Sequence, residues 1–189
     1  MKKSVSIALF ALLTLAFSVA TARAADDVAS PPLPMVGQEA PSFTLPSQDG
    51  SQVSLKSFHG KWVVVYFYPR DMTTGCTIEA HKFQDSLKDF EAKRAVVLGV
   101  SVDSTDSHKQ FCTKDSLTFR LLSDTDHSVV SSYGSLASHN GTFMANRNTF
   151  LINPKGKVVK VWTKVNPAES ASEVLAVLPN KGSSIKTSE

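Results

Sequence analysis

Cysteine is scarce in this chain of 189 residues, in which Cys76 and Cys112 are the only two. Two cysteines are too few to build the disulfide framework that replaces a large core in small secreted folds. The sequence also lacks a Cys-x-x-Cys pair, because Cys76 is followed by "TIE", and this absence disfavours a thioredoxin-like reductase. The two thiols can still form one bridge, either structural or redox-active.

Apolar runs long enough to span a membrane are missing beyond residue 25. The single long run, residues 4–20, follows two lysines and precedes the small-residue motif "ARA" at 22–24. This order is typical of a cleaved export signal, so we expect residues 1–24 to be removed; an uncleaved membrane anchor is the alternative. We therefore expect the protein to be exported to a bacterial periplasm and not to associate stably with the membrane.

A large excess of one charge is missing too. The formal net charge of +3 includes Lys2, Lys3 and Arg23, so removal of the expected signal leaves a charge near zero. A strongly basic surface is what the phosphates of nucleic acids attract. We therefore expect no nucleic-acid partner.

The rest of the chain is long enough for one domain with a full core. We expect a flexible lead-in at 25–36, the domain at 37–179 and a mobile tail at 180–189. Apolar periodicity and turn residues predict a hairpin at 43–55, strands at 61–68, 95–103 and 118–124, one helix face from Cys76 to Phe90, helices at 104–116, 127–134 and 166–178, and a hairpin at 148–165. The final helix should begin with Asn166 as its N-cap and Pro167 at its first position.

This order predicts an α/β fold, with a central mixed β-sheet flanked by helices on both faces and an N-terminal β-hairpin. Residues 135–147 carry no clear period and are expected to form a loop. Within them, Asn140-Gly141-Thr142 matches the glycosylation acceptor pattern, which is common by chance.

Cys76 stands where a strand gives way to a helix, in "YPRDMTTGCTIEA". If Thr73 is the N-cap, the thiol lies in the first turn, where backbone N–H groups are unpaired and the helix dipole favours a thiolate. Gly75 leaves the approach to the sulfur free of side chains, and Pro69 pins the preceding turn. The alternative is a buried structural cysteine, since Cys76 also lies on the apolar face of the helix.

The spacing of Pro69, Thr73 and Cys76, with "YFYPRDMTTGCTIEAHKFQD" (66–85), "VLGVSVDSTDSHKQF" (97–111), "LLSD" (121–124) and "RNTFLINPKGKVV" (147–159), resembles the peroxiredoxins. The resemblance covers nearly the whole domain and is strongest to the PrxQ, or bacterioferritin comigratory protein, subgroup. It implies a thioredoxin-like fold and a thiol-dependent peroxidase that reduces hydrogen peroxide and organic hydroperoxides. It implies no metal or organic cofactor, a thioredoxin-like dithiol as reductant, and a monomer.

The resemblance also implies roles for single residues. Cys76 matches the peroxidatic cysteine, whose thiolate attacks the O–O bond and becomes sulfenic acid. Thr73 and Arg147 match residues that contact the peroxide, and Pro69 matches the proline that covers the nucleophile. An arginine suits this role because it stays charged and offers five N–H donors.

Two departures from the family pattern concern the mechanism. Thr74 stands where many members have proline, which removes some preorganisation of the first helical turn. His81 stands where many PrxQ members have their resolving cysteine, so the resemblance assigns that role to Cys112, as in a branch with the thiol on a later helix. We expect an intramolecular Cys76–Cys112 disulfide and local unwinding of the first helix, because thiols on two helices are rarely within bonding range.

Other interpretations stay open. A one-cysteine cycle with an external thiol and an intermolecular disulfide are both possible, and a non-catalytic thioredoxin-fold binding protein is the rival outside enzymes. His81 is either a polar surface residue or an imidazolium that tunes Cys76. A zinc site of Cys76, His81, His108 and Cys112 is disfavoured, because the first two lie on different sides of a helix.

Overall fold

The computed structural model describes residues 32–180. Five strands form the central sheet in the order β5 (Arg120–Ser123), β4 (Ala95–Ser101), β3 (Trp62–Phe67), β8 (Asn148–Ile152) and β9 (Val158–Thr163). β3, β4 and β5 are parallel, whereas β8 runs antiparallel to β3 and β9, so the sheet is mixed as predicted. The expected export signal, most of the lead-in and all but the first residue of the tail lie outside the described residues.

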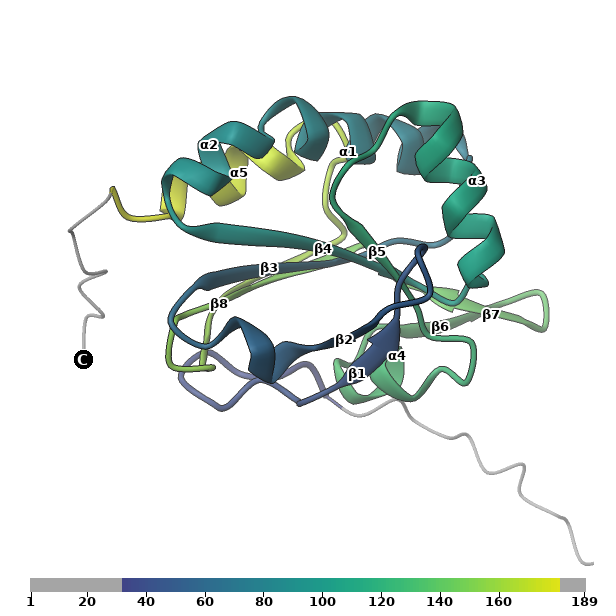
Figure 1. Cartoon of the computed structure of the whole chain (residues 1–189). Coiled ribbons are helices and arrows are strands. Elements are labelled where there is room, and N and C mark those ends of the chain that lie inside the picture. The colour runs from purple at the N-terminus through teal and green to yellow at the C-terminus, as the bar shows by residue number, and fades with distance from the viewer. Residues whose placement is uncertain (1–31, 181–189) are drawn as a thin grey trace, which may run out of the picture.

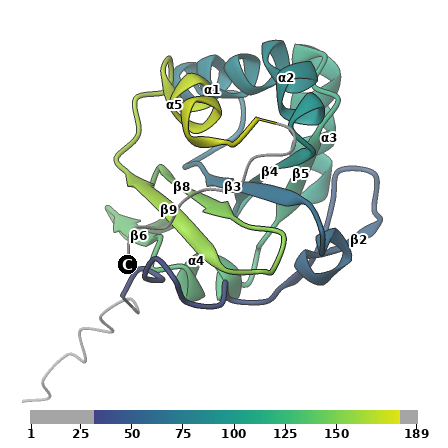
Figure 2. The same cartoon turned by 90° about the vertical axis from the view of Figure 1, so that its left-hand side faces the viewer.

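Two layers enclose this sheet (Figures 1 and 2). On one side lie α1 (Thr74–Asp85), α2 (Leu87–Ala92), α3 (Thr105–Asp115) and α5 (Ser170–Val177). On the other lie the hairpin of β1 (Thr44–Pro46) and β2 (Gln52–Ser54), the 3₁₀ helix η1 (Leu55–Phe58), α4 (Ser128–Ser132) and a hairpin of β6 (Leu136–His139) and β7 (Thr142–Ala145). The thioredoxin-like fold with its N-terminal hairpin is confirmed. Between residues 32 and 180, no helix has the length and apolar character needed to cross a membrane.

The central strand β3 is buried on both faces because successive side chains point to opposite sides of a sheet. Val64, Tyr66 and Tyr68 enter the core beneath α1, α3 and α5, a cluster that also contains Cys76 and Cys112. Val63, Val65 and Phe67 enter the second core, beside the N-terminal hairpin and α4. The apolar run of the sequence therefore supplies two cores at once, and its carboxyl end leads directly into the loop before α1.

The single helix expected from Cys76 to Phe90 is interrupted. α1 ends at Asp85 and α2 begins at Leu87, and Ser86 caps both helices. The backbone carbonyl of Ser86 accepts from the N–H groups of Asp89 and Phe90, while its side chain makes no capping bond. Phe83 and Phe90 nevertheless pack into the same core, so the predicted face is preserved across the break.

The start of the last helix was placed too early. α5 begins at Ser170, with Glu169 as its N-cap. Asn166 instead organises the turn before the helix: its side chain accepts from the N–H of Ala168 at 3.1 Å, and its carbonyl accepts from those of Glu169 and Ser170. The predicted N-cap was therefore wrong, because Asn166 caps the preceding turn and not α5.

The loop expected at 135–147 was wrong, because β6 and β7 form a hairpin there. Its two-residue connection is Asn140-Gly141, with φ of 49° and 78°. Two positive φ angles match a type I′ turn, for which Asn-Gly is the strongest sequence signal. That signal was present but was interpreted only as part of a glycosylation pattern.

Gly99 in β4 should be intolerant of even one added methyl group. A Cβ there would lie 2.7 Å from Leu121 Cδ2 and 2.8 Å from the Tyr66 ring. Both neighbours are fully buried and cannot move aside freely. We expect Gly99→Ala to reduce the free energy of unfolding by about 1–3 kcal/mol, measured by urea denaturation of the reduced protein; a loss below about 0.5 kcal/mol would contradict this.

Candidate active site

The site is centred on Cys76, in the first turn of α1. Thr73 is the N-cap, as predicted, with extended backbone angles of −83° and 150°. Its hydroxyl does not cap the helix but donates to the carbonyl of Arg70 at 3.1 Å. The Cys76 side chain is buried, with the unpaired N–H groups of the first helical turn around it.

Arg147 is the residue that the tertiary structure brings to this thiol. Its Nη2 donates to Cys76 Sγ at 3.3 Å. Arg147 directly precedes β8, and β8 begins beside the carboxyl end of β3, where Tyr66 pairs with Thr149. Because that same end of β3 leads into α1, the antiparallel pairing places a distant guanidinium next to the helix N-terminus. The guanidinium therefore places a positive charge and an N–H donor beside the sulfur.

Glu79 holds Arg147 in place and was missed by the sequence analysis. Its carboxylate forms an ion pair with Arg147 Nη1, and the Glu79 side chain is fully buried. Burial raises the pKa of Glu79, whereas Arg147 and the Ser170 hydroxyl act in the opposite direction. Burial acts to lower the pKa of the Arg147 guanidinium. The interactions with Glu79 and Cys76 act in the opposite direction and are stronger, so this pKa is raised. The only sequence signal was the i,i+3 spacing of Cys76 and Glu79 on one helix face.

The contact between Arg147 and Cys76 leaves little room for a side chain at position 75, which is occupied by Gly75. A Cβ at this position would lie 3.3 Å from Arg147 Nη2 and 3.6 Å from Pro167 Cγ. The space was expected to be needed by the substrate, and part of it is occupied by the guanidinium. Pro69, which ends the strand, is half-buried, while Thr73 is exposed at the entrance of the helix.

Cys112 lies on α3, on the same side of the sheet as Cys76. Both cysteines are free and buried, and both pack in the core that contains Tyr66. Burial, helped by the negative charge of Asp71, raises the pKa of the Cys112 thiol to about 11. The second thiol is therefore protonated at neutral pH, unlike a cysteine prepared for nucleophilic attack.

A buried polar network lies between the loop before α1 and the start of α3. Asp71 Oδ1 accepts from the Tyr68 hydroxyl at 2.7 Å, and Oδ2 accepts from the Ser107 hydroxyl at 2.7 Å. His108 Nδ1 lies 2.8 Å from the same Oδ2, and both side chains are buried. The sequence analysis considered His108 only as a zinc ligand and did not anticipate this network.

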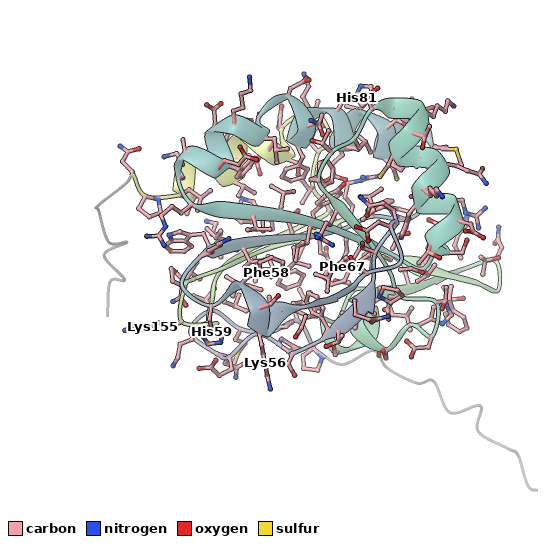
Figure 3. The ribbon with its side chains drawn as sticks, in the orientation of Figure 1. Lys56, Phe58, His59, Phe67, His81 and Lys155 are labelled. Carbon is pink, nitrogen blue, oxygen red and sulfur yellow. The ribbon has the colours of Figure 1, made fainter. Side chains whose placement is uncertain are left out.

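His81 joins two helices at the surface. Its Nε2 lies 3.1 Å from Asp115 Oδ1 on α3, and about half of its side chain is exposed. Figure 3 shows it in the helical layer, at the end of the molecule where α1 and α3 meet. Within residues 32–180, no three side chains of the His, Cys, Asp and Glu types converge in a way that could hold a metal ion.

A surface pocket of about 270 Å³ lies elsewhere, between η1, the segment before β1 and the turn after β8. Lys56, Phe58 and His59 contribute to its lining, and Figure 3 places them on the other side of the sheet from His81. None of the predicted site residues lines this pocket. This pocket is therefore separate from the site centred on Cys76.

Together, a thioredoxin-like fold and a thiol held between a helix N-terminus and a guanidinium define a thiol-dependent oxidoreductase. The chain belongs to the AhpC/TSA family, whose model matches residues 36–161, and it is a peroxiredoxin of the kind called Bcp or PrxQ.

Three relatives illustrate the similarity. Peroxiredoxin Bcp of Bacillus subtilis is 40% identical over 147 residues, which cover 76% of this chain and 94% of the relative. Bacterioferritin comigratory protein of Xanthomonas campestris has a solved structure with a TM-score of 0.69 and 38% identity, covering 72% of this chain and 89% of the other. A PrxQ mutant of Xylella fastidiosa superposes with a TM-score of 0.73 at 32% identity, with coverages of 77% and 96%.

Replacing Glu79 should test the buried ion pair. Glu79→Gln leaves Arg147 partly buried without its counter-charge, so we expect a loss of about 3 kcal/mol in the free energy of unfolding. The matched control is Glu39→Gln, because Glu39 faces Lys157 at 3.8 Å with both side chains exposed, and such pairs contribute less than about 1 kcal/mol. Equal losses in urea denaturation would contradict the prediction.

Adding a methyl group at position 75 should displace the guanidinium from the sulfur. We expect Gly75→Ala to lower the second-order rate constant for peroxide oxidation of Cys76 about tenfold, since small misplacements of catalytic groups are costly. Ile78→Ala, on the exposed side of α1, serves as the control and should keep the parent rate. Stopped-flow oxidation measures both, and a Gly75→Ala rate within twofold of the parent would refute the steric argument.

Proposed function

We propose that this peroxiredoxin reduces hydrogen peroxide and organic hydroperoxides through Cys76. The contact between Arg147 and the Cys76 sulfur at the N-terminus of α1 carries this proposal. The thiolate attacks one peroxide oxygen, the O–O bond breaks, and Cys76 becomes sulfenic acid while water or an alcohol leaves. The guanidinium donors face the negative charge that develops on the departing oxygen, with Thr73 and Pro69 beside the peroxide.

We propose further that Cys112 resolves the sulfenic acid as an intramolecular disulfide. Both thiols belong to one core cluster on the same side of the sheet, which supports a bridge within one chain. Solved structures of Xanthomonas campestris peroxiredoxin Q include serine mutants of two cysteines that are 36 residues apart, the spacing of Cys76 and Cys112 here. Because both thiols are buried in separate helices, α1 must unwind locally before they can meet.

A thioredoxin-like dithiol is the proposed reductant, since it could exchange with the disulfide and release both thiols. We also propose that the protein is a monomer. In this proposal it acts in the periplasm, after export and cleavage of residues 1–24. Mass spectrometry of the protein from a periplasmic extract tests this part, and an intact N-terminus in that fraction would contradict it.

The proposed substrate range is supported by the activity of a relative. The Xanthomonas campestris relative is described as reducing alkyl peroxides, which supports organic hydroperoxides as substrates here. The rival resolution routes are a one-cysteine cycle with an external thiol and an intermolecular disulfide. A non-catalytic binding protein of this fold would leave Cys76 unoxidised at low peroxide concentration.

Stopped-flow oxidation of the reduced protein, followed by mass analysis, separates these routes. We expect the parent to lose two thiols per peroxide and to gain one intrachain disulfide. Cys112→Ser should still react rapidly but stop at a sulfenic acid, which dimedone traps. Cys76→Ser should show no fast reaction at all.

Each rival predicts a different result. A Cys112→Ser protein that turns over at the parental rate with the dithiol reductant would favour the one-cysteine cycle. Disulfide-linked dimers from the parent would favour the intermolecular bridge. A parent protein without a fast phase would refute the peroxidase proposal.

A further inference from the structure

His108 has an unusual combination of burial and incomplete hydrogen bonding. Its side chain is fully buried, and Nδ1 lies 2.8 Å from Asp71 Oδ2. Its other nitrogen, Nε2, is also buried and has no hydrogen-bond partner. Buried polar atoms are rarely left unpaired, and such an atom often marks a functional group.

The surroundings of Asp71 determine which nitrogen carries the proton. Asp71 already accepts from the hydroxyls of Tyr68 and Ser107, while its backbone N–H donates to Asp103 at 2.9 Å. A carboxylate can only accept from the imidazole, so the proton must lie on Nδ1. In the neutral ring, Nε2 then carries a free lone pair, the arrangement by which an aspartate fixes the tautomer of a histidine base.

The group one helical turn further along α3 is Cys112. Positions four apart on a helix have Cβ atoms about 5–6 Å from each other. Cys112 needs a base, because burial and the charge of Asp71 raise its pKa to about 11, while a disulfide forms only from a thiolate nucleophile. His108 and Cys112 therefore lie on the same face of α3.

We propose that the Asp71–His108 pair is the general base of the resolving step. This inference rests on the proposed function, in which Cys112 resolves Cys76. As α1 unwinds and the thiol shifts, His108 Nε2 accepts the Cys112 proton. The sulfur attacks the sulfenic sulfur of Cys76, the S–S bond forms and the S–O bond breaks. The proton from His108 then joins the departing hydroxide as water, and the oxidising equivalent is the one that peroxide left on Cys76.

Other ionisable groups near this pair do not replace the base. Tyr66 on β3 and Tyr68 directly after this strand lie near the pair, and burial raises the pKa of both hydroxyls well above the usual value. Asp103 contacts the backbone of Asp71 from the end of β4, and Asp71 itself is occupied by three donors. His81 and Asp115 bind one another at the far end of α3. Among these groups, only His108 has a fully buried ring nitrogen without a hydrogen-bond partner.

The test is His108→Asn, because the asparagine amide can still donate to Asp71 but provides no base at the position of Nε2. We expect peroxide to oxidise Cys76 at the parental rate and disulfide formation to slow about 100-fold at pH 7. The slowed phase should then rise about tenfold per pH unit between pH 7 and 9, following the thiolate fraction. The parental phase should rise less steeply over the same range, because His108 accepts the proton of Cys112. Rapid mixing with acid quench and mass analysis separates the two phases.

Tyr68→Phe is the control for a purely structural role. It removes a bond to the same carboxylate but keeps His108, so its disulfide phase should retain the parental pH profile. Imidazole added to His108→Ala should restore part of the lost rate, an effect that a packing defect would not produce. Far-UV circular dichroism checks that each variant folds.

The outcomes are distinguishable from failure of the proposed function. If Cys112→Ser forms the same product as the parent, resolution by Cys112 is wrong, and the base proposal fails with it. If Cys112 is required but His108→Asn keeps both the rate and the pH profile, the base proposal alone is overturned. Equal slowing of both phases, or identical profiles in His108→Asn and Tyr68→Phe, would also overturn it in favour of a structural network.

Discussion

The contact between Cys76 and Arg147 is the interaction on which the site depends. A buried thiolate is energetically costly unless a cation and oriented N–H groups stabilise its negative charge. Arg147 supplies the cation, and the buried Glu79 holds the guanidinium from the other side. The ion pair therefore joins α1, which carries the nucleophile, to the start of β8, and the open space at Gly75 allows the two to approach.

The same arrangement creates a conflict between stability and turnover. Cys112 is buried in α3, and the surface contacts between α1 and the end of α3 hold the two helices together. They include His81 with Asp115, and Gln84 with Thr118, whose N–H donates to it at 2.7 Å. The proposed disulfide between the two thiols requires some of these contacts to open. Exposed polar contacts of this kind contribute little energy each, which favours local unfolding of α1.

The two thiols have opposite environments, and that difference fits a sequential reaction. Cys76 lies beside a guanidinium, whereas Cys112 lies in the core near the negative charge of Asp71, with a pKa of about 11. In the proposed cycle, a resolving thiol that stays protonated in the folded protein cannot compete for oxidants. It becomes a nucleophile only when its surroundings change. The buried Asp71–His108 pair, fixed between the loop before α1 and the start of α3, lies where that change would occur.

Much of this protein was determined locally by its sequence. The buried strand 61–68, the Thr73 cap, the thiol in the first helical turn and the turn at Asn140-Gly141 all depend on short-range preferences that neighbouring residues express. The predicted layers follow because alternating buried strands and amphipathic helices have few ways to cover one another. The misplaced start of α5 concerns the end of an element, where local rules are least exact, whereas the break at Ser86 divides one predicted helix into two.

The tertiary structure alone decided which distant charges meet. Glu79 looks like an ordinary helix-surface acid in the sequence, and nothing in its neighbours reveals that Arg147 arrives from a strand that pairs with β3. Asp71 and His108 are 37 positions apart and meet only because β3 and β4 are parallel neighbours, so that the loop before α1 and the start of α3 share one edge of the sheet. Long-range pairing of strands sets these contacts, and charge partners are therefore a property of the fold rather than of any short segment.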